Sequence, residues 1–196
     1  MNVQRKNLSM EILQNYIKIF DLPLGDTVCK ELIKQFEECK DQQEEIKLEG
    51  HRSFNQITLH NHDNWKKYED WLNYVFKEAV RFYIEKSGVT EKQFPQQYAF
   101  EAFRMKRYMP NDIDEFNDHV DVGNHESAKR FLAFFFYLND TDDESGCTEF
   151  PHFNLRVVPK TNRMLVFPPM WTYLHAGRKV TGKTPKYTMG SYLHYV

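Results

Sequence analysis

The sequence predicts an α+β fold, with helices packed on a β-sandwich or jelly roll. Two observations lead to this fold class. Up to about residue 95 the apolar residues recur mainly at helical spacing, whereas from Phe100 onward they alternate with period two in short runs. Because no helical window separates these later runs, the strands should pair mainly antiparallel. We expect one domain, in which residues 1–95 form a mainly helical support and residues 96–196 form the jelly-roll core.

The composition is that of a soluble globular protein, with 41% hydrophobic and 28% charged residues. A net charge of -2 and the lack of a long apolar run favour neither nucleic acid nor membrane as a partner. Cysteine is sparse and forms no C-x-x-C pair, and residues 1–10 lack the apolar segment of a signal peptide. These features predict a reducing compartment, and we expect a cytoplasmic protein.

The first elements follow from apolar spacing and from the residues that break it. Residues 12–20 are expected to form a strand, which a Leu-Pro-Leu-Gly segment ends. A helix should begin near Asp26 or Thr27, either of which can cap free backbone N–H groups. The polar run 37–49 should continue or fray this helix. Its core-facing stripe is expected to be Val28, Leu32 and Phe36.

A second helix is predicted over residues 64–86, with Gly88 as its C-terminal stop. A short strand is possible at 53–59. The neighbouring pair His60 and His62 is interpreted as part of an exposed loop and helix cap, not as a metal site. After the helix we expect β-type runs at 100–108, 130–139, 148–150, 155–158, 163–167, 172–175 and 187–195.

The motif that points to chemistry is His119-Val-Asp121, the only H-x-D in the sequence. On an extended segment, side chains two apart share a face, so an imidazole and a carboxylate lie side by side. One more histidine from a neighbouring strand completes a two-His, one-carboxylate set, which suits Fe(II) and leaves open coordination positions. His175 is the candidate for that histidine.

A cation follows His175 at a spacing that suits a hairpin. The residues between His175 and Lys186 are polar and include Gly177, Gly182 and Pro185, so a loop is expected there. Lys186 then lies on the next strand and can point into the same cavity as His175. A co-substrate that chelates the metal through one end would place its distal carboxylate near this lysine, and a buried carboxylate needs a charge partner.

In this order and spacing, the motifs resemble those of Fe(II)/2-oxoglutarate-dependent dioxygenases of the prolyl 4-hydroxylase-like group. The resemblance runs from about Met105 to the C-terminus and includes Arg107-Tyr108, His119-x-Asp121, Ser145-Gly-Cys-Thr-Glu-Phe-Pro151, His175-Ala-Gly and Lys186-Tyr187. Two features depart from the usual pattern. Ser145 and Cys147 replace a Gly and a Glu of the usual turn, and the segment before Lys186 is one residue longer, which leaves Lys183 as an alternative anion partner.

The resemblance implies a double-stranded β-helix core and a role for each motif residue. His119, Asp121 and His175 would hold Fe(II), and Lys186 would pair with the distal carboxylate of 2-oxoglutarate. Hydrogen bonds to that ligand are implied for Tyr108 and Tyr137, and a place in the pocket wall for Thr188 and Tyr192. The implied cofactors are Fe(II), 2-oxoglutarate as co-substrate, O₂ and, as a further candidate, ascorbate. The implied reaction couples decarboxylation of 2-oxoglutarate to hydroxylation of a substrate C–H, which we expect to belong to a prolyl residue in a peptide or protein.

Several alternatives stay open. Arg104 and Lys106 are alternatives to Lys186 as anion partner, and Tyr108 and Tyr137 can equally be plain core aromatics. The histidines expected to be hydrogen-bonded core residues are His125, His152 and His194. Cys147 is either an inert thiol or one that oxidises near the site entrance.

The functional class and the substrate also have alternatives. The same site could oxidise a small molecule or another side chain, or the fold could be a non-catalytic, metal-binding interaction module. Two acid-rich segments, around residues 112–118 and 140–144, are either solvated loops or a negatively charged entrance. The second interpretation predicts a basic substrate.

Overall fold

The computed structural model describes residues 11–196, and residues 1–10, where the absence of a signal peptide was expected, lie outside it. The main helices are α2 (Asp26–Glu38) and α3 (Lys66–Ser87). The strands are β1 (Lys18–Asp21), β2 (Glu44–Leu48), β3 (Arg52–Thr58), β4 (Tyr98–Phe100), β5 (Arg104–Tyr108), β6 (Glu115–His119), β7 (Arg130–Tyr137), β8 (Thr148–Phe150), β9 (Leu155–Val157), β10 (Arg163–Phe167), β11 (His175–Gly177) and β12 (Lys186–Tyr195). Of the helices described, none is long and apolar enough to cross a membrane.

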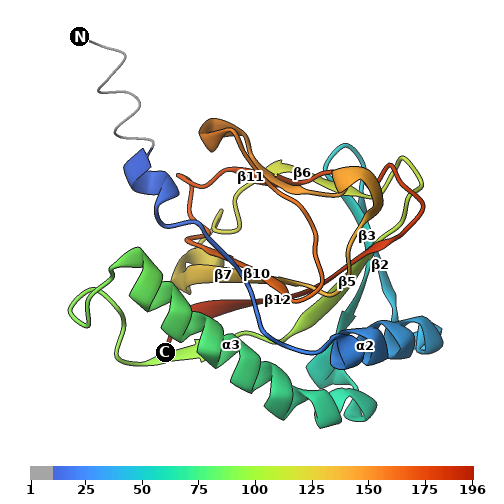
Figure 1. The fold of residues 1–196 in the computed structure, drawn as a ribbon, viewed down its shortest axis with the longest axis horizontal. Coiled ribbons are helices and arrows are strands. Elements are labelled where there is room, and N and C mark those ends of the chain that lie inside the picture. The colour runs from blue at the N-terminus through green and yellow to red at the C-terminus, as the bar shows by residue number, and fades with distance from the viewer. Residues whose placement is uncertain (1–10) are drawn as a thin grey trace.

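These strands form one sheet in the order β1-β10-β7-β12-β5-β3-β6-β11-β8-β9, with β2 beside β3 and β4 beside β12. The pairs are antiparallel throughout. The sheet curls into a nearly closed barrel, and α2 and α3 cover one side of it from outside (Figure 1). The predicted α+β class and antiparallel jelly-roll core are therefore confirmed.

Helix α3 anchors the covered side of the barrel. Its apolar stripe includes Leu72, Phe76 and Ala79, which are fully buried, and the Phe76 ring packs 5.8 Å from the ring of Phe134 on β7. Gly88 takes the left-handed conformation, with φ of 70°, and ends the helix as predicted. Because the helices occupy the outer face of β7 and β12, the inner faces of these strands are left to form a cavity.

The N-terminal half is less helical than expected. Residues 11–14 are helical and the first strand is only β1, so the predicted strand over 12–20 is wrong in its first part. Helix α2 begins at Asp26 after Gly25, and no side chain caps it. The polar run 37–49 ends the helix at Glu38 and then forms β2, because pairing with β3 outweighs the helical preference of its Glu and Lys residues.

The predicted strands of the C-terminal half are mostly present, with shifted ends. The predicted run 100–108 is divided into β4 and β5, and the run 172–175 is replaced by β11, which begins at His175. Strand β6 was not predicted. It matters for the site, because it carries His119 at its end.

Candidate active site

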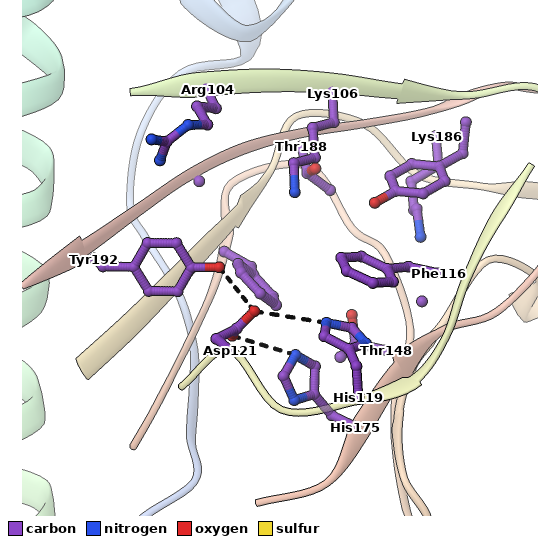
Figure 2. A pocket seen from close by; sticks show the side chains of 14 residues that line it. Arg104, Lys106, Phe116, His119, Asp121, Thr148, His175, Lys186, Thr188 and Tyr192 are labelled. Carbon is purple, nitrogen blue, oxygen red and sulfur yellow. Dashed lines mark hydrogen bonds and ion pairs between the residues drawn. The ribbon is translucent and has the colours of Figure 1, made fainter. Parts of the chain in front are cut away.

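The candidate metal ligands meet inside the barrel, where β6 and β11 run side by side. His119 ends β6, His175 begins β11, and the two residues are paired directly across the sheet. Asp121 lies in a bend just after β6, where its backbone N–H donates to the carbonyl of Pro169. This bend turns the carboxylate toward the two imidazoles. The ligand atoms of the three side chains all lie within 4.8 Å of one another (Figure 2).

Backbone contacts fix the orientation of both imidazoles. The Nδ1 atom of His119 lies 2.6 Å from the carbonyl oxygen of Asn117, and that of His175 lies 3.0 Å from the carbonyl oxygen of Tyr173. Since Nδ1 donates to these carbonyls, each Nε2 keeps its lone pair. The Nε2 atoms of His119 and His175 face the two oxygens of Asp121 at 3.6 and 3.4 Å.

Two atoms of this cluster are buried and lack a hydrogen-bond partner within the described chain, His175 Nε2 and Asp121 Oδ2. Buried polar atoms are rarely left unpaired, and an ion is one way to satisfy them. Two imidazoles and one carboxylate on one side of an open pocket form a donor set that suits Fe(II). The residues present therefore fit the metal that the motif predicts.

The electrostatic environment favours the ligating forms of these groups. Burial alone would raise the pKa of Asp121, but His175, His119 and the Tyr192 hydroxyl together bring it below its usual range. Burial lowers the pKa of His175 to about 4, although the charge of Asp121 opposes this shift. At neutral pH the carboxylate is therefore charged and this imidazole neutral, as metal binding requires.

A buried lysine lies across the same pocket from the cluster. Lys186 is the first residue of β12 and is only 2% exposed. Its Nζ atom donates to the carbonyl of Gly146 at 2.8 Å and lies 4.1 Å from the ring centroid of Tyr108. Burial lowers the pKa of Lys186 to about 7, and no described carboxylate forms an ion pair with it. An anionic ligand in the pocket would supply this partner.

Strand β12 forms one wall of the pocket. Lys186, Thr188 and Tyr192 line it, as their even spacing predicts, while Tyr187 points outward and donates to Glu37 of α2 at 2.8 Å. The hydroxyl of Tyr192 donates to Asp121 Oδ1 at 2.9 Å. Tyr192 is thus placed to orient the carboxylate, whereas Lys186 and Thr188 face the space available to a co-substrate. Their roles stay predictions.

The two tyrosines that were expected to bond the co-substrate lie in different places. Tyr108 lines the pocket beside Lys186. Tyr137 is fully buried behind the lining, and its hydroxyl donates to Oγ1 of Thr148 at 2.6 Å. Thr148 lines the pocket and Tyr137 does not, so the expected hydrogen bond from Tyr137 to the co-substrate stays a prediction.

The alternative anion partners are also separated by the structure. Lys183 is outside the pocket lining, in the loop before β12, where its backbone N–H donates to Asp142 at 2.8 Å. Arg104 and Lys106 on β5 do line the pocket. Figure 2 shows Lys106 and Lys186 extending toward the interior from the wall opposite the His–Asp–His cluster. Burial lowers the pKa of Lys106 to about 8.

The other histidines that the sequence singled out, and Cys147, do not join the metal cluster. Of all described residues, only His119, Asp121 and His175 form a group with metal-binding geometry, so the 60–62 pair is not part of one. His125 and His152 are exposed and His194 is half-buried, which corrects the expectation that they are core residues. Cys147 is fully buried, and its sulfur accepts a hydrogen bond from Arg156 at 3.3 Å. The thiol is therefore not open to solvent, which favours the inert thiol over the oxidisable one.

Sequence reasoning missed three residues around His119. Phe116 stacks on the His119 imidazole with ring centroids 3.5 Å apart, and His51 packs edge-on against Phe116 at 5.3 Å. The guanidinium of Arg52 lies 5.5 Å from the centroid of the same ring. Phe116 alternates with polar neighbours before His119, and this alternation was the available signal for β6. Nothing local marks His51 and Arg52, because only the pairing of β3 with β6 brings them here.

Comparison with known proteins agrees with this geometry. Residues 103–194 match the 2OG-Fe(II) oxygenase superfamily, a segment that contains every candidate ligand and Lys186. No curated protein sequence matches the chain significantly. The segment that carries the candidate site therefore resembles the 2OG-Fe(II) oxygenase superfamily, and the fold of the chain is that of the prolyl hydroxylases described next.

Several solved structures share the fold at low sequence identity. The viral collagen prolyl hydroxylase of Paramecium Bursaria Chlorella virus-1, in complex with 2OG, is 20% identical with a TM-score of 0.68, and the match covers 92% of this chain and 97% of that one. A Trichoplax adhaerens prolyl hydroxylase, in complex with a peptide fragment of the hypoxia inducible factor oxygen degradation domain, is 14% identical with a TM-score of 0.71, covering 98% and 92%. A Pseudomonas putida prolyl-4-hydroxylase is 13% identical with a TM-score of 0.68, covering 95% and 98%.

Proposed function

We propose that this protein is an Fe(II)- and 2-oxoglutarate-dependent dioxygenase that hydroxylates a prolyl residue in a peptide or protein. The observation that carries the proposal is one pocket with two complementary ends. One end holds His119, Asp121 and His175, and the other holds the buried cation of Lys186. A ligand that chelates a metal at one end and carries a carboxylate at the other matches this arrangement.

Each side chain has a defined task in this proposal. His119, Asp121 and His175 hold Fe(II), and Lys186 binds the distal carboxylate of 2-oxoglutarate. Bound Fe(II) supplies O₂ activation, which couples oxidation of 2-oxoglutarate to succinate and CO₂ with hydroxylation of the substrate C–H. Tyr192 keeps Asp121 oriented through its hydrogen bond. Tyr108, Phe116 and Phe135 form aromatic walls that limit water around the reacting groups.

Prolyl hydroxylation is favoured over the alternatives by two features. The solved structures with a similar fold are prolyl hydroxylases, and one of them is in complex with a peptide fragment. The site also adjoins an open groove between β3, β5 and the segment around Val120, which suits an extended chain better than a small molecule. A non-catalytic metal-binding module is disfavoured, because it would not need a buried lysine facing the metal site.

Lys186→Ala tests the proposal most directly. Removing one partner of a buried charge pair costs about 3–5 kcal/mol, so the KM for 2-oxoglutarate should rise at least about a hundredfold while Fe(II) binding is kept. Lys183→Ala, which removes a lysine outside the pocket, is the matched control and should leave KM within about twofold. Succinate release and a +16 Da product on proline-containing peptides are the measurements. If the wild-type protein binds Fe(II) but forms no succinate with any peptide or small-molecule substrate, the enzyme proposal is wrong.

Three expectations about the cellular context stay predictions. A cytoplasmic location rests on the three cysteines, which are all free thiols. A role for ascorbate as reductant is testable by adding it to the turnover assay. The absence of nucleic-acid and membrane partners rests on the overall composition alone.

A further inference from the structure

A basic groove lies beside the candidate metal site. Its lining contains four cations and a histidine, Arg52, Arg104, Lys106, Arg130 and His51. The one carboxylate in this lining is Asp121, which belongs to the metal cluster. The chain as a whole carries a net charge of -2, so the positive groove is a local concentration of charge and not a consequence of composition.

The positive charge of the groove is only partly neutralised by the protein. Glu101 pairs with Arg104 at 3.3 Å and with Arg130 at 2.7 Å, so one carboxylate serves two guanidinium groups. Arg52 and Lys106 form no ion pair and no side-chain hydrogen bond with any described residue. At least two cations of the groove therefore lack an anionic partner.

Aromatic rings hold these cations in place. Lys106 Nζ lies 4.7 Å from the ring centroid of Phe54, and the guanidinium of Arg130 lies 4.1 Å from that of Tyr192. Arg52 lies over Phe116, as described above. Contacts with ring faces position Arg52 and Lys106 without using their N–H groups, which stay available for a ligand's oxygens. Arg130 differs, because its guanidinium also donates to Glu101 and to the carbonyl of Asp121.

Four carboxylates of the acid-rich loops that suggested a basic substrate form contacts away from the groove. Asp118 pairs with Arg178 at 2.9 Å, and Asp114 is buried and accepts a hydrogen bond from Ser53 at 2.8 Å. Asp140 accepts from the backbone of Thr161, and Asp142 accepts from the backbone of Lys183 and Thr184. These carboxylates line neither the pocket nor the groove. The prediction of a basic substrate is untested, and the groove itself favours the opposite charge.

We propose that the groove binds an acidic peptide segment, with Asp or Glu residues flanking the residue that is hydroxylated. This inference rests on the proposed function, because the groove leads to the candidate metal site. Carboxylates of the peptide would pair with Arg52 and Lys106, the two cations without partners. Arg104 and Arg130 share Glu101 and would add a weaker attraction.

The test compares binding and turnover of matched proline peptides that differ only in their flanks. One carries Asp and Glu next to the proline, the other carries Lys and Arg. Binding is measured with fluorescently labelled versions whose proline is replaced by alanine, so that it does not depend on hydroxylation. We expect the acidic peptide to bind at least about tenfold more tightly at low salt, and this preference to shrink at 1 M salt, where the screening length is about 3 Å.

Arg52→Glu reverses a charge on the groove without touching the candidate ligands. It should weaken binding of the acidic peptide at least about tenfold and strengthen binding of the basic one. Lys47→Glu makes the same charge change on the exposed side of the same hairpin, outside the groove, and should change neither Kd more than about twofold. Arg52→Gln, with a thermal melt of each variant, separates loss of charge from loss of folding.

The outcomes distinguish this inference from the proposed function. Acidic preference that disappears in Arg52→Glu supports the inference, even if no peptide is hydroxylated and the proposed function therefore fails. Hydroxylation of both peptides with equal binding, or with preference for the basic one, overturns the inference and leaves the enzyme proposal intact. Binding of a single-stranded oligonucleotide, but of neither peptide, in a manner sensitive to Arg52→Glu would also overturn it.

Discussion

Tyr192 shows how a single hydrogen bond can prepare the candidate metal site. Its hydroxyl holds Asp121 Oδ1, which leaves Oδ2 as the unpaired oxygen beside His175. The carboxylate is therefore fixed in one orientation before any metal arrives. Groups that orient a metal ligand in this way often matter almost as much as the ligand itself.

Tyr192→Phe should consequently weaken Fe(II) binding by about 10- to 100-fold, the usual cost of losing a group that orients a ligand. The KM for 2-oxoglutarate, measured at saturating Fe(II), should change little, because Lys186 is untouched. Anaerobic titration of the metal-free protein gives the affinity. Tyr195→Phe removes the same hydroxyl from an exposed position on the same strand and serves as control. An Fe(II) affinity equal in both variants would contradict the positioning role of Tyr192.

At the scale of the element, the turn before β8 places the lysine of the pocket. Gly146 has a φ of 69°, and its carbonyl accepts the hydrogen bond from Lys186 Nζ. A Cβ atom at this position would lie 2.9 Å from Cγ2 of Val180. The turn therefore needs glycine for two reasons. The backbone is left-handed at this position, and the loop between β11 and β12, which contains Val180, approaches it closely.

We expect Gly146→Ala to lower the free energy of unfolding by about 1–3 kcal/mol, because it adds backbone strain and a close contact. Gly123→Ala, at a glycine with negative φ and open space around it, is the control and should change stability by less than about 0.5 kcal/mol. Chemical denaturation measures both. If Gly146→Ala is as stable as the wild type, the strain argument is incorrect.

Elements also explain what the sequence could and could not predict. The pocket face of β12 was predictable, because Lys186, Thr188 and Tyr192 follow the two-residue repeat of a strand. The polar run that becomes β2 was not, since its Glu and Lys residues prefer a helix and only pairing with β3 decides otherwise.

The residues of the groove could not be predicted from local sequence patterns either. His51 and Arg52 reach His119 through the closure of the barrel, which no local pattern encodes. The position of Tyr137 behind the pocket lining could not be predicted for a related reason. Strand parity points its side chain inward, but parity cannot show that Thr148 on another strand lies in front of it.

At the scale of the whole molecule, the barrel encloses cations that cost stability. Burial lowers the pKa of Lys186 to about 7 and that of Lys106 to about 8, from an ordinary value of 10.5. Between the lowered and the ordinary pKa, the unfolded chain binds more protons than the folded one, so these groups make stability rise with pH. Below the lowered pKa the folded protein carries the full cost of burying the charge.

Lys186→Met should therefore stabilise the ligand-free protein most at pH 6, and this gain should shrink as the pH rises from 7 toward 10.5. The same variant should lose 2-oxoglutarate binding. Urea denaturation of wild type and variant at pH 6 and pH 9, both without ligand, gives the two differences in the free energy of unfolding. A stability difference that is constant or increases with pH would contradict a buried, titrating Lys186.

The place of β12 in the sheet has a consequence for how the chain reaches its folded state. This strand is the last in sequence but lies in the interior of the sheet, between β7 and β5. Its pairing spans long sequence separations, and such contacts form late and slowly during folding. Until β12 is inserted, Lys186 and Tyr192 are missing from the pocket. A barrel without β12 therefore lacks the lysine that is proposed to bind the co-substrate and the tyrosine that orients Asp121. We therefore expect the proposed oxygenase activity only in a chain whose folding is complete.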